Sequence, residues 1–194
     1  MAQLLDENFK LERYGLYVRF VEESDAEFIL KLRTNPDLNR YIHQTPPDVE
    51  VQRQWIHNYK ERQRAGKDFY FIFEEPQSVR LGVCRIYDIT EENFTIGSWI
   101  FSPQAPIGSA ILADIITREI AFELFPDKEH LFDVKRANTN VNRYHETFKS
   151  TLLFQDELTN YYTCSKENFE KYKNLHLRMF TKKKLNNYDK QRKV

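Results

Sequence analysis

Small residues between a strand pattern and a long helix pattern form the segment with the clearest chemical use. The segment reads Ser102-Pro103-Gln104-Ala105-Pro106-Ile107-Gly108-Ser109-Ala110. The first turn of a helix offers unpaired N–H groups and the positive end of the helix dipole, and both favour a bound phosphate. Gly108 and Ala110 would let the backbone approach a pyrophosphate closely. A plain strand-to-helix turn would need the same small residues, and spacing alone favours that simpler interpretation.

Missing motifs and the spacing of the cysteines and histidines argue against several kinds of site. No Gly-x-x-x-x-Gly-Lys-Ser/Thr motif is present, and no Gly-x-Gly-x-x-Gly follows the first strand pattern, which argues against P-loop and dinucleotide folds. Cys84 and Cys164 are too far apart in sequence for a disulfide framework or a Cys-x-x-Cys metal knuckle. His57, His130 and His176 lack metal-ligand spacing, so we expect no metal.

The hydrophobic pattern before this segment predicts one strand, two helices and an antiparallel run. A strand over 16–21 leads into a helix that begins at the capping box of Ser24 and Glu27 and ends at Pro36. A second helix follows Asp48. It ends at Gly66, and alternating patterns then predict strands over 69–73, 79–86 and 94–101.

The pattern after the segment predicts a long helix and a mixed C-terminal part. Leu112, Ile116, Ile120 and Leu124 form one stripe of an amphipathic helix. The later elements are expected as a strand over 131–134, a helix over 141–148, strands over 158–164 and 174–180, and a helical turn over 166–173 between those strands.

Composition indicates one folded domain with a basic end. The chain has 194 residues, is 41% hydrophobic and 14% aromatic, and has a formal net charge of +0, which excludes global disorder and makes nucleic acid an unexpected partner. We expect one domain over residues 1–180 and a basic tail over 181–194, where Lys182-Lys183-Lys184 is typical of a solvated segment. No signal peptide or 18-residue apolar run is visible, so a cytoplasmic protein is expected.

Four stretches, in this order, resemble the GNAT N-acetyltransferase superfamily, in the branch that acetylates amino sugars and protein N-termini. The stretches are 18–26, 39–56, 97–110 and 134–148. The resemblance implies an α+β, three-layer fold whose mixed, mostly antiparallel sheet has about six to seven strands, with helices on both faces. Ala105 stands where the family usually has Arg or Gln, and Lys149 where it usually has Gly.

The resemblance also implies acetyl-CoA as co-substrate and assigns residues to it. A backbone N–H of Ile100 or Phe101 would bind the thioester oxygen. The expected cofactor-binding residues are Trp99, Ile100, Phe101, Ala105, Pro106, Ile107, Gly108, Ser109, Ala110, Asn138 and Arg143.

Proton transfer and acceptor binding are assigned by position in the family pattern. His145 occupies the place of the usual Tyr and is the expected proton donor to the departing thiolate, with the adjacent Tyr144 as its rival. Arg40 and Tyr41 lie where this branch builds its acceptor pocket. The general base is not apparent, and the candidates are Glu22, His43 and Asp88.

Three functions remain open from the sequence. The first is transfer of acetyl to the primary amine of a small molecule, such as a nucleotide-linked amino sugar. The second is acetylation of a protein N-terminus. The third is a binding module that kept the fold without catalysis, which the departures at Ala105 and Lys149 favour. A homodimer is compatible with this pattern, although no hydrophobic stripe demands one.

Overall fold

A computed structural model describes the backbone of residues 5–191 and the side chains of residues 5–180. An eight-stranded sheet has the order β1-β2-β3-β4-β5-β6-β8-β7. Its strands are β1 (Lys10–Arg13), β2 (Leu16–Phe20), β3 (Phe69–Glu75), β4 (Val79–Tyr87), β5 (Asn93–Phe101), β6 (Glu129–Lys135), β7 (Thr151–Gln155) and β8 (Thr159–Cys164). The helices are α1 (Ala26–Thr34), α2 (Val49–Arg64), α3 (Ser109–Leu124), α4 (Thr139–Glu146) and α5 (Lys166–Gln191).

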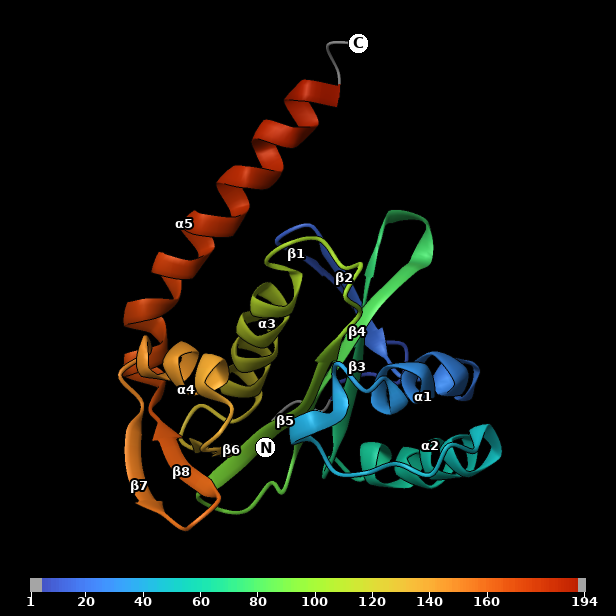
Figure 1. Cartoon of the computed structure of the whole chain (residues 1–194), viewed down its shortest axis with the longest axis horizontal. Coiled ribbons are helices and arrows are strands. Elements are labelled where there is room, and N and C mark those ends of the chain that lie inside the picture. The colour runs from blue at the N-terminus through green and yellow to red at the C-terminus, as the bar shows by residue number, and fades with distance from the viewer. Residues whose placement is uncertain (1–4, 192–194) are drawn as a thin grey trace.

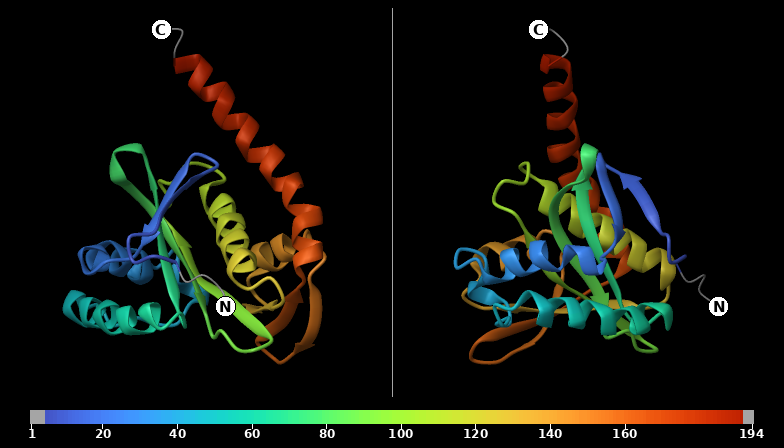
Figure 2. Two further views of the ribbon diagram at one scale, coloured as in Figure 1. Left: turned by 180° about the vertical axis from the view of Figure 1, so that it is seen from behind. Right: turned by 90° about the vertical axis from the view of Figure 1, so that its right-hand side faces the viewer.

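Helices cover both faces of the sheet, as Figures 1 and 2 show. Strand β3 is buried on both faces because its alternate side chains enter two separate cores. Phe69, Phe71 and Phe73 pack with α3, whereas Tyr70 and Ile72 pack with α1 and α2. The predicted three-layer α+β fold is therefore confirmed, with one or two strands more than expected.

The C-terminal strand expected over 174–180 is wrong, because these residues belong to α5. Large apolar side chains and one histidine of this part are buried or half-buried, and they recur about every three to four residues, as on one helix face: Phe169, Tyr172, His176, Leu177 and Phe180. Two edge strands, β1 and β7, had no prediction. The expected basic character of residues 181–194 rests on side chains that lie outside the described part of the chain.

The start of α1 also differs in detail from the prediction. Glu22 and Asp25, rather than Ser24 and Glu27, form the capping box, in which the Glu22 N–H donates to the Asp25 carboxylate over 2.9 Å. Arg19 holds Asp25 in place with two further hydrogen bonds. The helix therefore begins at Ala26 within an ion-paired turn.

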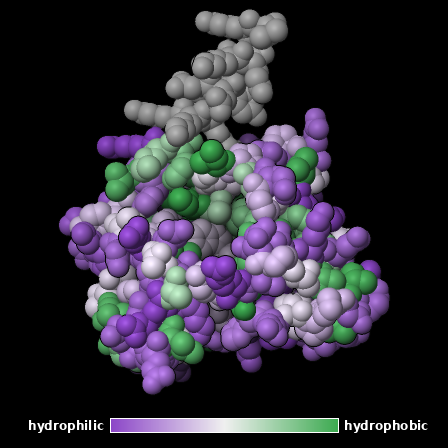
Figure 3. Space-filling model, viewed as in Figure 1, coloured by the Kyte–Doolittle hydropathy of each residue, from purple (hydrophilic) through white to green (hydrophobic). Residues whose placement is uncertain are grey.

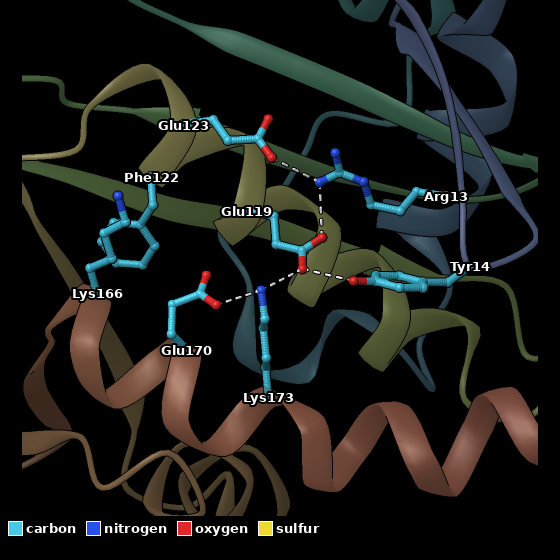
Figure 4. A pocket seen from close by; sticks show the side chains of 8 residues that line it. All are labelled: Arg13, Tyr14, Glu119, Phe122, Glu123, Lys166, Glu170 and Lys173. Atoms are coloured by element: carbon cyan, nitrogen blue, oxygen red, sulfur yellow. Dashed lines mark hydrogen bonds and ion pairs between the residues drawn. The ribbon is translucent and has the colours of Figure 1, made fainter.

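Helix α5 is fastened to α3 by a cluster of charged side chains, drawn in Figure 4. Glu119 of α3 is 6% exposed and accepts hydrogen bonds from Arg13, the Tyr14 hydroxyl and Lys173 over 2.9, 2.8 and 2.8 Å. Burial and the Glu119 carboxylate raise the pKa of the Tyr14 hydroxyl, so it stays a donor. The cluster fixes α5 to the C-terminal half of α3, whereas the small-residue loop lies at the opposite, N-terminal end of α3.

Candidate active site at the parting of β5 and β6

Strands β5 and β6 pair over only a short length and then separate. Their parallel pairing joins Asn93–Thr95 to Glu129–Leu131, although β5 continues to Phe101 and β6 to Lys135. Alternate backbone N–H groups of β5 beyond Thr95 therefore face the gap rather than a neighbouring strand. A bulge in the β4–β5 pairing, where Ser98 has a φ of 49°, lies at this point.

The small-residue loop leads from β5 directly into α3. Gly108 has a φ of 91°, the left-handed conformation that glycine adopts without strain, and it is the residue before the helix. The amides of Ala110 and Ile111 lie in the first turn, where helix geometry supplies no acceptor. The Ser109 hydroxyl is fully buried and has no hydrogen-bond partner within the described residues. These unpaired donors suit an anionic ligand.

The strand and the helix on either side of this loop are joined by Trp99. Its indole N–H donates to the Ala110 carbonyl over 2.9 Å. Ile100 and Phe101 are 6% and 9% exposed, whereas Ile107 in the loop is 88% exposed. The predicted cofactor residues of β5, the loop and α3 are thus brought together. Asn138 precedes α4, and Arg143 on α4 is exposed.

Phe180 of α5 covers this loop. A Cβ added at Gly108 would overlap the Phe180 ring. Phe180 is half-buried and packs on the same core as Ala105, Ala110 and Tyr144. The approach to the first turn of α3 is therefore narrowed by the protein's own C-terminal helix.

Tyr144 of α4 lies next to Trp99 of β5. The two rings are 5.4 Å apart, and the Tyr144 hydroxyl donates to Asp114 Oδ2 over 2.6 Å. Burial and the Asp114 carboxylate raise the pKa of Tyr144 well above its ordinary value. Tyr144 therefore carries a proton at neutral pH.

His145 points into the core instead. It is 6% exposed, its ring lies 4.2 Å from that of Phe132, and its Nδ1 accepts from Arg118 over 2.9 Å. Burial and the Arg118 guanidinium lower the pKa of His145, so the imidazole is neutral near pH 7. This geometry favours Tyr144 over His145, the residue preferred from the family pattern, as the proton donor.

Arg118 and Asp114 form a buried ion pair beneath these residues. Both lie on α3, one helical turn apart, with a 2.8 Å contact between Arg118 Nε and Asp114 Oδ2. Arg118 is fully buried, and its guanidinium lies over the rings of Phe132, Phe148 and Phe169. The pair fixes Tyr144 and His145 from one side.

A cavity opens on the face of the sheet that α1 and α2 cover. It has a volume of about 350 Å³ and is lined by Arg33, His43, Gln44, Thr45, Pro46, Val51, Gln52, Trp55, Tyr70, Arg85, Tyr87 and Ser98. It reaches the β5 bulge through Ser98. None of its lining residues, all within the described part, is acidic, and Arg33 and Arg85 contribute positive charge.

The cationic side chains of this cavity are held in position. Arg85 is paired with buried Asp68, which Arg62 also contacts, and its guanidinium lies 5.1 Å from the Trp55 ring. Arg33 Nε donates to the Thr45 hydroxyl over 2.6 Å. Arg33, Arg85 and Arg62 carry three positive charges, and Asp68 carries one negative charge. The surroundings of the cavity therefore have a net positive charge, which suits an anion.

Among the predicted acceptor residues, Arg40 and Tyr41, and the general-base candidates, Glu22, His43 and Asp88, only His43 lines this cavity. His43 lines it, whereas Arg40 is exposed and does not. The Tyr41 hydroxyl donates to the Ala137 carbonyl over 3.1 Å, at the turn before Asn138. Glu22 lies in the turn before α1, and Asp88 follows β4 with a φ of 49°. Neither Glu22 nor Asp88 lines the cavity.

Sequence reasoning missed Arg33, Arg85, Tyr87 and Asp114. Arg85 offered a signal, because it interrupts an otherwise apolar run from Leu81 to Ile86. Asp114 and Arg118 offered another, as opposite charges four residues apart within an apolar helix.

Comparison with known proteins identifies the family. The acetyltransferase (GNAT) domain matches residues 16–149, and the chain belongs to this family. No curated protein matches the chain.

Solved structures agree in fold. The structure described as apo FdhC, a nucleotide-linked sugar GNAT, is 32% identical, with a TM-score of 0.79 over 89% of this chain and 99% of that chain. The ribosomal-protein-S5-alanine acetyltransferase from Vibrio fischeri is 14% identical, with a TM-score of 0.69 over 84% and 99%. A spermidine N-acetyltransferase variant from Vibrio cholerae is 14% identical, with a TM-score of 0.62 over 81% and 97%.

Within the described residues, no helix is long and apolar enough to cross a membrane. The same part of the chain contains no cluster of His, Cys, Asp or Glu suited to a metal ion. The family match and the similar solved structures show that the chain is an acyltransferase of the GNAT fold.

Proposed function

We propose that this protein transfers an acetyl group from acetyl-CoA directly to the primary amine of a nucleotide-linked amino sugar. The observation that carries the acceptor class is the cavity with Arg33 and Arg85 in its wall and no acidic residue in its described lining. The phosphates of a nucleotide would meet two guanidiniums there, which form strong charge-assisted hydrogen bonds. The 32% identical structure described as a nucleotide-linked sugar GNAT supports the same class.

A polyamine acceptor fits this cavity poorly. A polycation such as spermidine needs carboxylates to replace its lost hydration, whereas this cavity presents cations. A protein N-terminus carries one positive charge before deprotonation and gains no partner from Arg33 or Arg85 either. The positive charge of the cavity therefore favours an acceptor molecule that carries anionic groups in addition to its amine.

The donor would occupy the gap on the other side of β5. Its pyrophosphate would lie at the first turn of α3, against the Ala110 and Ile111 amides and the unpaired Ser109 hydroxyl. The thioester oxygen would accept from a β5 backbone N–H near Ile100. The β5 bulge at Ser98 then lies between donor and acceptor sides, so the amine can reach the carbonyl carbon.

The reaction forms one C–N bond and breaks one C–S bond. The neutral amine attacks the thioester carbonyl, and its proton passes to a base on the acceptor side, for which His43 is the candidate that lines the cavity. The CoA sulfur leaves and takes the proton of the Tyr144 hydroxyl. Tyr144 then regains a proton from solvent or from the product side.

An acyl-cysteine route is disfavoured by the two thiols. Cys84 and Cys164 are both buried, and burial raises the pKa of Cys84 to about 12. Burial also raises the pKa of Cys164. Neither thiol forms the thiolate that covalent catalysis requires, so direct transfer is the simpler mechanism.

Replacement of Arg33 tests the acceptor assignment. Arg33→Met should raise the KM for a nucleotide-linked amino sugar about tenfold or more, because one charge-assisted contact is lost, and should leave the KM for acetyl-CoA unchanged. Arg40→Met is the matched control, since Arg40 is exposed and outside the cavity lining. Equal effects of the two substitutions would contradict the assignment.

A further inference from the structure

Strand β7 forms an edge of the sheet and is exposed along its whole length. It pairs with β8 on one side, and the sheet order places nothing beyond it. All five residues, Thr151-Leu152-Leu153-Phe154-Gln155, are exposed. In Figure 3, hydrophobic side chains gather at the lower left, over the position of this hairpin in Figure 1. The outer row of backbone N–H and C=O groups therefore faces solvent.

Proteins normally protect such an edge, and β7 has little protection. Charged residues, proline or a covering segment are the usual devices, and residues 151–155 contain neither a charge nor a proline. Leu152, Leu153 and Phe154 are 46%, 53% and 59% exposed, and Leu158 in the adjoining turn is 69% exposed. A bulge at Leu153 is the one irregularity in its pairing with β8.

The bulge distributes the apolar side chains over both faces of the edge. Leu152 is opposite Tyr162, whereas Phe154 is opposite Tyr161, and directly opposite residues share a face. Tyr162 is buried on the helix-covered face, and Phe154 stacks on Tyr161 on the other, with ring centres 4.2 Å apart. A strand added at this edge would therefore meet apolar side chains above and below it.

The ends of β7 have opposite charges, and this favours one arrangement. Exposed Lys149 precedes the strand, and exposed Glu157 follows it. Neither side chain forms an ion pair within the part of the chain that the structure describes. Antiparallel pairing of two copies about a two-fold axis places the beginning of one β7 beside the end of the other. Lys149 of each copy then lies near Glu157 of the other copy, which gives two symmetric pairs.

We propose that β7 pairs antiparallel with β7 of a second copy of this chain, joining two sheets into one across a two-fold axis. Backbone hydrogen bonds along the edge and burial of Leu152, Leu153 and Phe154 stabilise the dimer, and the two Lys149–Glu157 pairs set its direction. The dimer is independent of the acetyl donor and acceptor.

Sedimentation velocity or light scattering on the full chain tests the dimer. The wild-type protein should have twice the mass of one chain, and Leu153→Lys should be monomeric, because two lysines would meet near the two-fold axis. Val79→Lys is the matched control, since Val79 is a 51% exposed apolar residue on β4 and should leave the dimer intact. A monomeric wild-type protein, or a dimer that Leu153→Lys does not weaken, would overturn the proposal.

A charge reversal distinguishes this pairing from other contacts. Lys149→Glu and Glu157→Lys should each raise the dimer dissociation constant about tenfold, because two symmetric pairs become repulsive. The double variant should restore wild-type association at low salt. Failure of the double variant to recover, with circular dichroism unchanged, would exclude antiparallel β7 pairing.

Discussion

At the scale of single residues, the proposed mechanism depends on which group can give up a proton beside the thioester. Position in the family pattern selects His145, but the structure places its ring against Phe132 and uses its Nδ1 as an acceptor for Arg118. Tyr144, one residue earlier on α4, lies beside Trp99, which belongs to β5 where this strand separates from β6. Adjacent helical side chains point about 100° apart, so a sequence alone could not decide which of the two faces the gap.

Substitution of both residues separates their roles. Tyr144→Phe should lower kcat by about 100-fold, the usual loss when a proton donor is removed, with little change in the acetyl-CoA dissociation constant. His145→Gln keeps an acceptor for Arg118 and should retain most of the turnover. Steady-state kinetics with both substrates is the measurement, and a collapse of kcat in His145→Gln with normal Tyr144→Phe would reverse the assignment.

His130 gives the stability of the protein a dependence on pH. It is 1% exposed, its ring stacks on Phe94 and Phe132, and neither of its nitrogens has a partner among the described residues. Burial, with Arg118 and His145 nearby, lowers the pKa of His130 well below 6.5. The unfolded chain therefore binds a proton that the folded protein does not, and stability is lost as pH falls below about 6.5.

Urea unfolding at several pH values tests this linkage. His130→Phe should reduce the pH slope of the free energy of unfolding by about one proton, roughly 1.4 kcal/mol per pH unit, within that acidic window. Above pH 8 the difference between variant and wild type should be constant, because the histidine is neutral in both states there. An unchanged acidic slope would show that His130 titrates alike in the folded and unfolded chains.

At the scale of elements, local patterns predicted most helices and strands, and long-range packing decided the rest. The core helix α3 and the strands β3 to β5 follow their hydrophobic periods, and their predictions are confirmed. The stretch 174–180 is rich in large side chains that a strand also accepts, and its helical form becomes evident only from its contacts with α3 and α4. Strand β7 escaped prediction because its apolar residues are not buried at all.

The buried ion pair should contribute strongly to the stability of α3 and α4. Arg118→Met removes the partner of Asp114 and should lower the free energy of unfolding by about 3 to 5 kcal/mol, the usual cost of leaving one buried charge unpaired. Chemical denaturation measures this loss. A loss below about 1 kcal/mol would indicate that Asp114 is adequately satisfied by Tyr144 alone.

Helix α5 should compete with the acetyl donor, since Phe180 covers Gly108. Phe180→Ala should tighten acetyl-CoA binding about three- to tenfold. In the wild type the Phe180 ring must leave Gly108 before the donor can bind, and the variant does not lose this packing energy. Met179→Ala is the matched control, as Met179 is the neighbouring residue and is 55% exposed. Calorimetric titration measures both, and weaker binding to Phe180→Ala would make Phe180 a contact of the donor instead.

At the scale of the whole molecule, the sheet separates two chemically different sides. The loop before α3 and the gap at β6 lie on one side, and the cavity with Arg33 and Arg85 lies on the other. The order of elements was enough to predict the fold, and it also predicted the turn from β5 into α3, because the loop and its helix are contiguous in sequence. The cavity with Arg33 and Arg85, which we propose binds the acceptor, was not predictable. Its residues come from α1, α2, β3, β4, β5 and the loop between the helices, and only the tertiary fold brings them together.

Transfer of labelled acetyl from acetyl-CoA, with products identified by mass spectrometry, tests the central claim most directly. The wild-type protein should acetylate a nucleotide-linked amino sugar, and spermidine or an N-terminal peptide supplied at the same concentration should remain largely unmodified. Efficient acetylation of spermidine, with the nucleotide-linked amino sugar left untouched, would contradict the proposed acceptor.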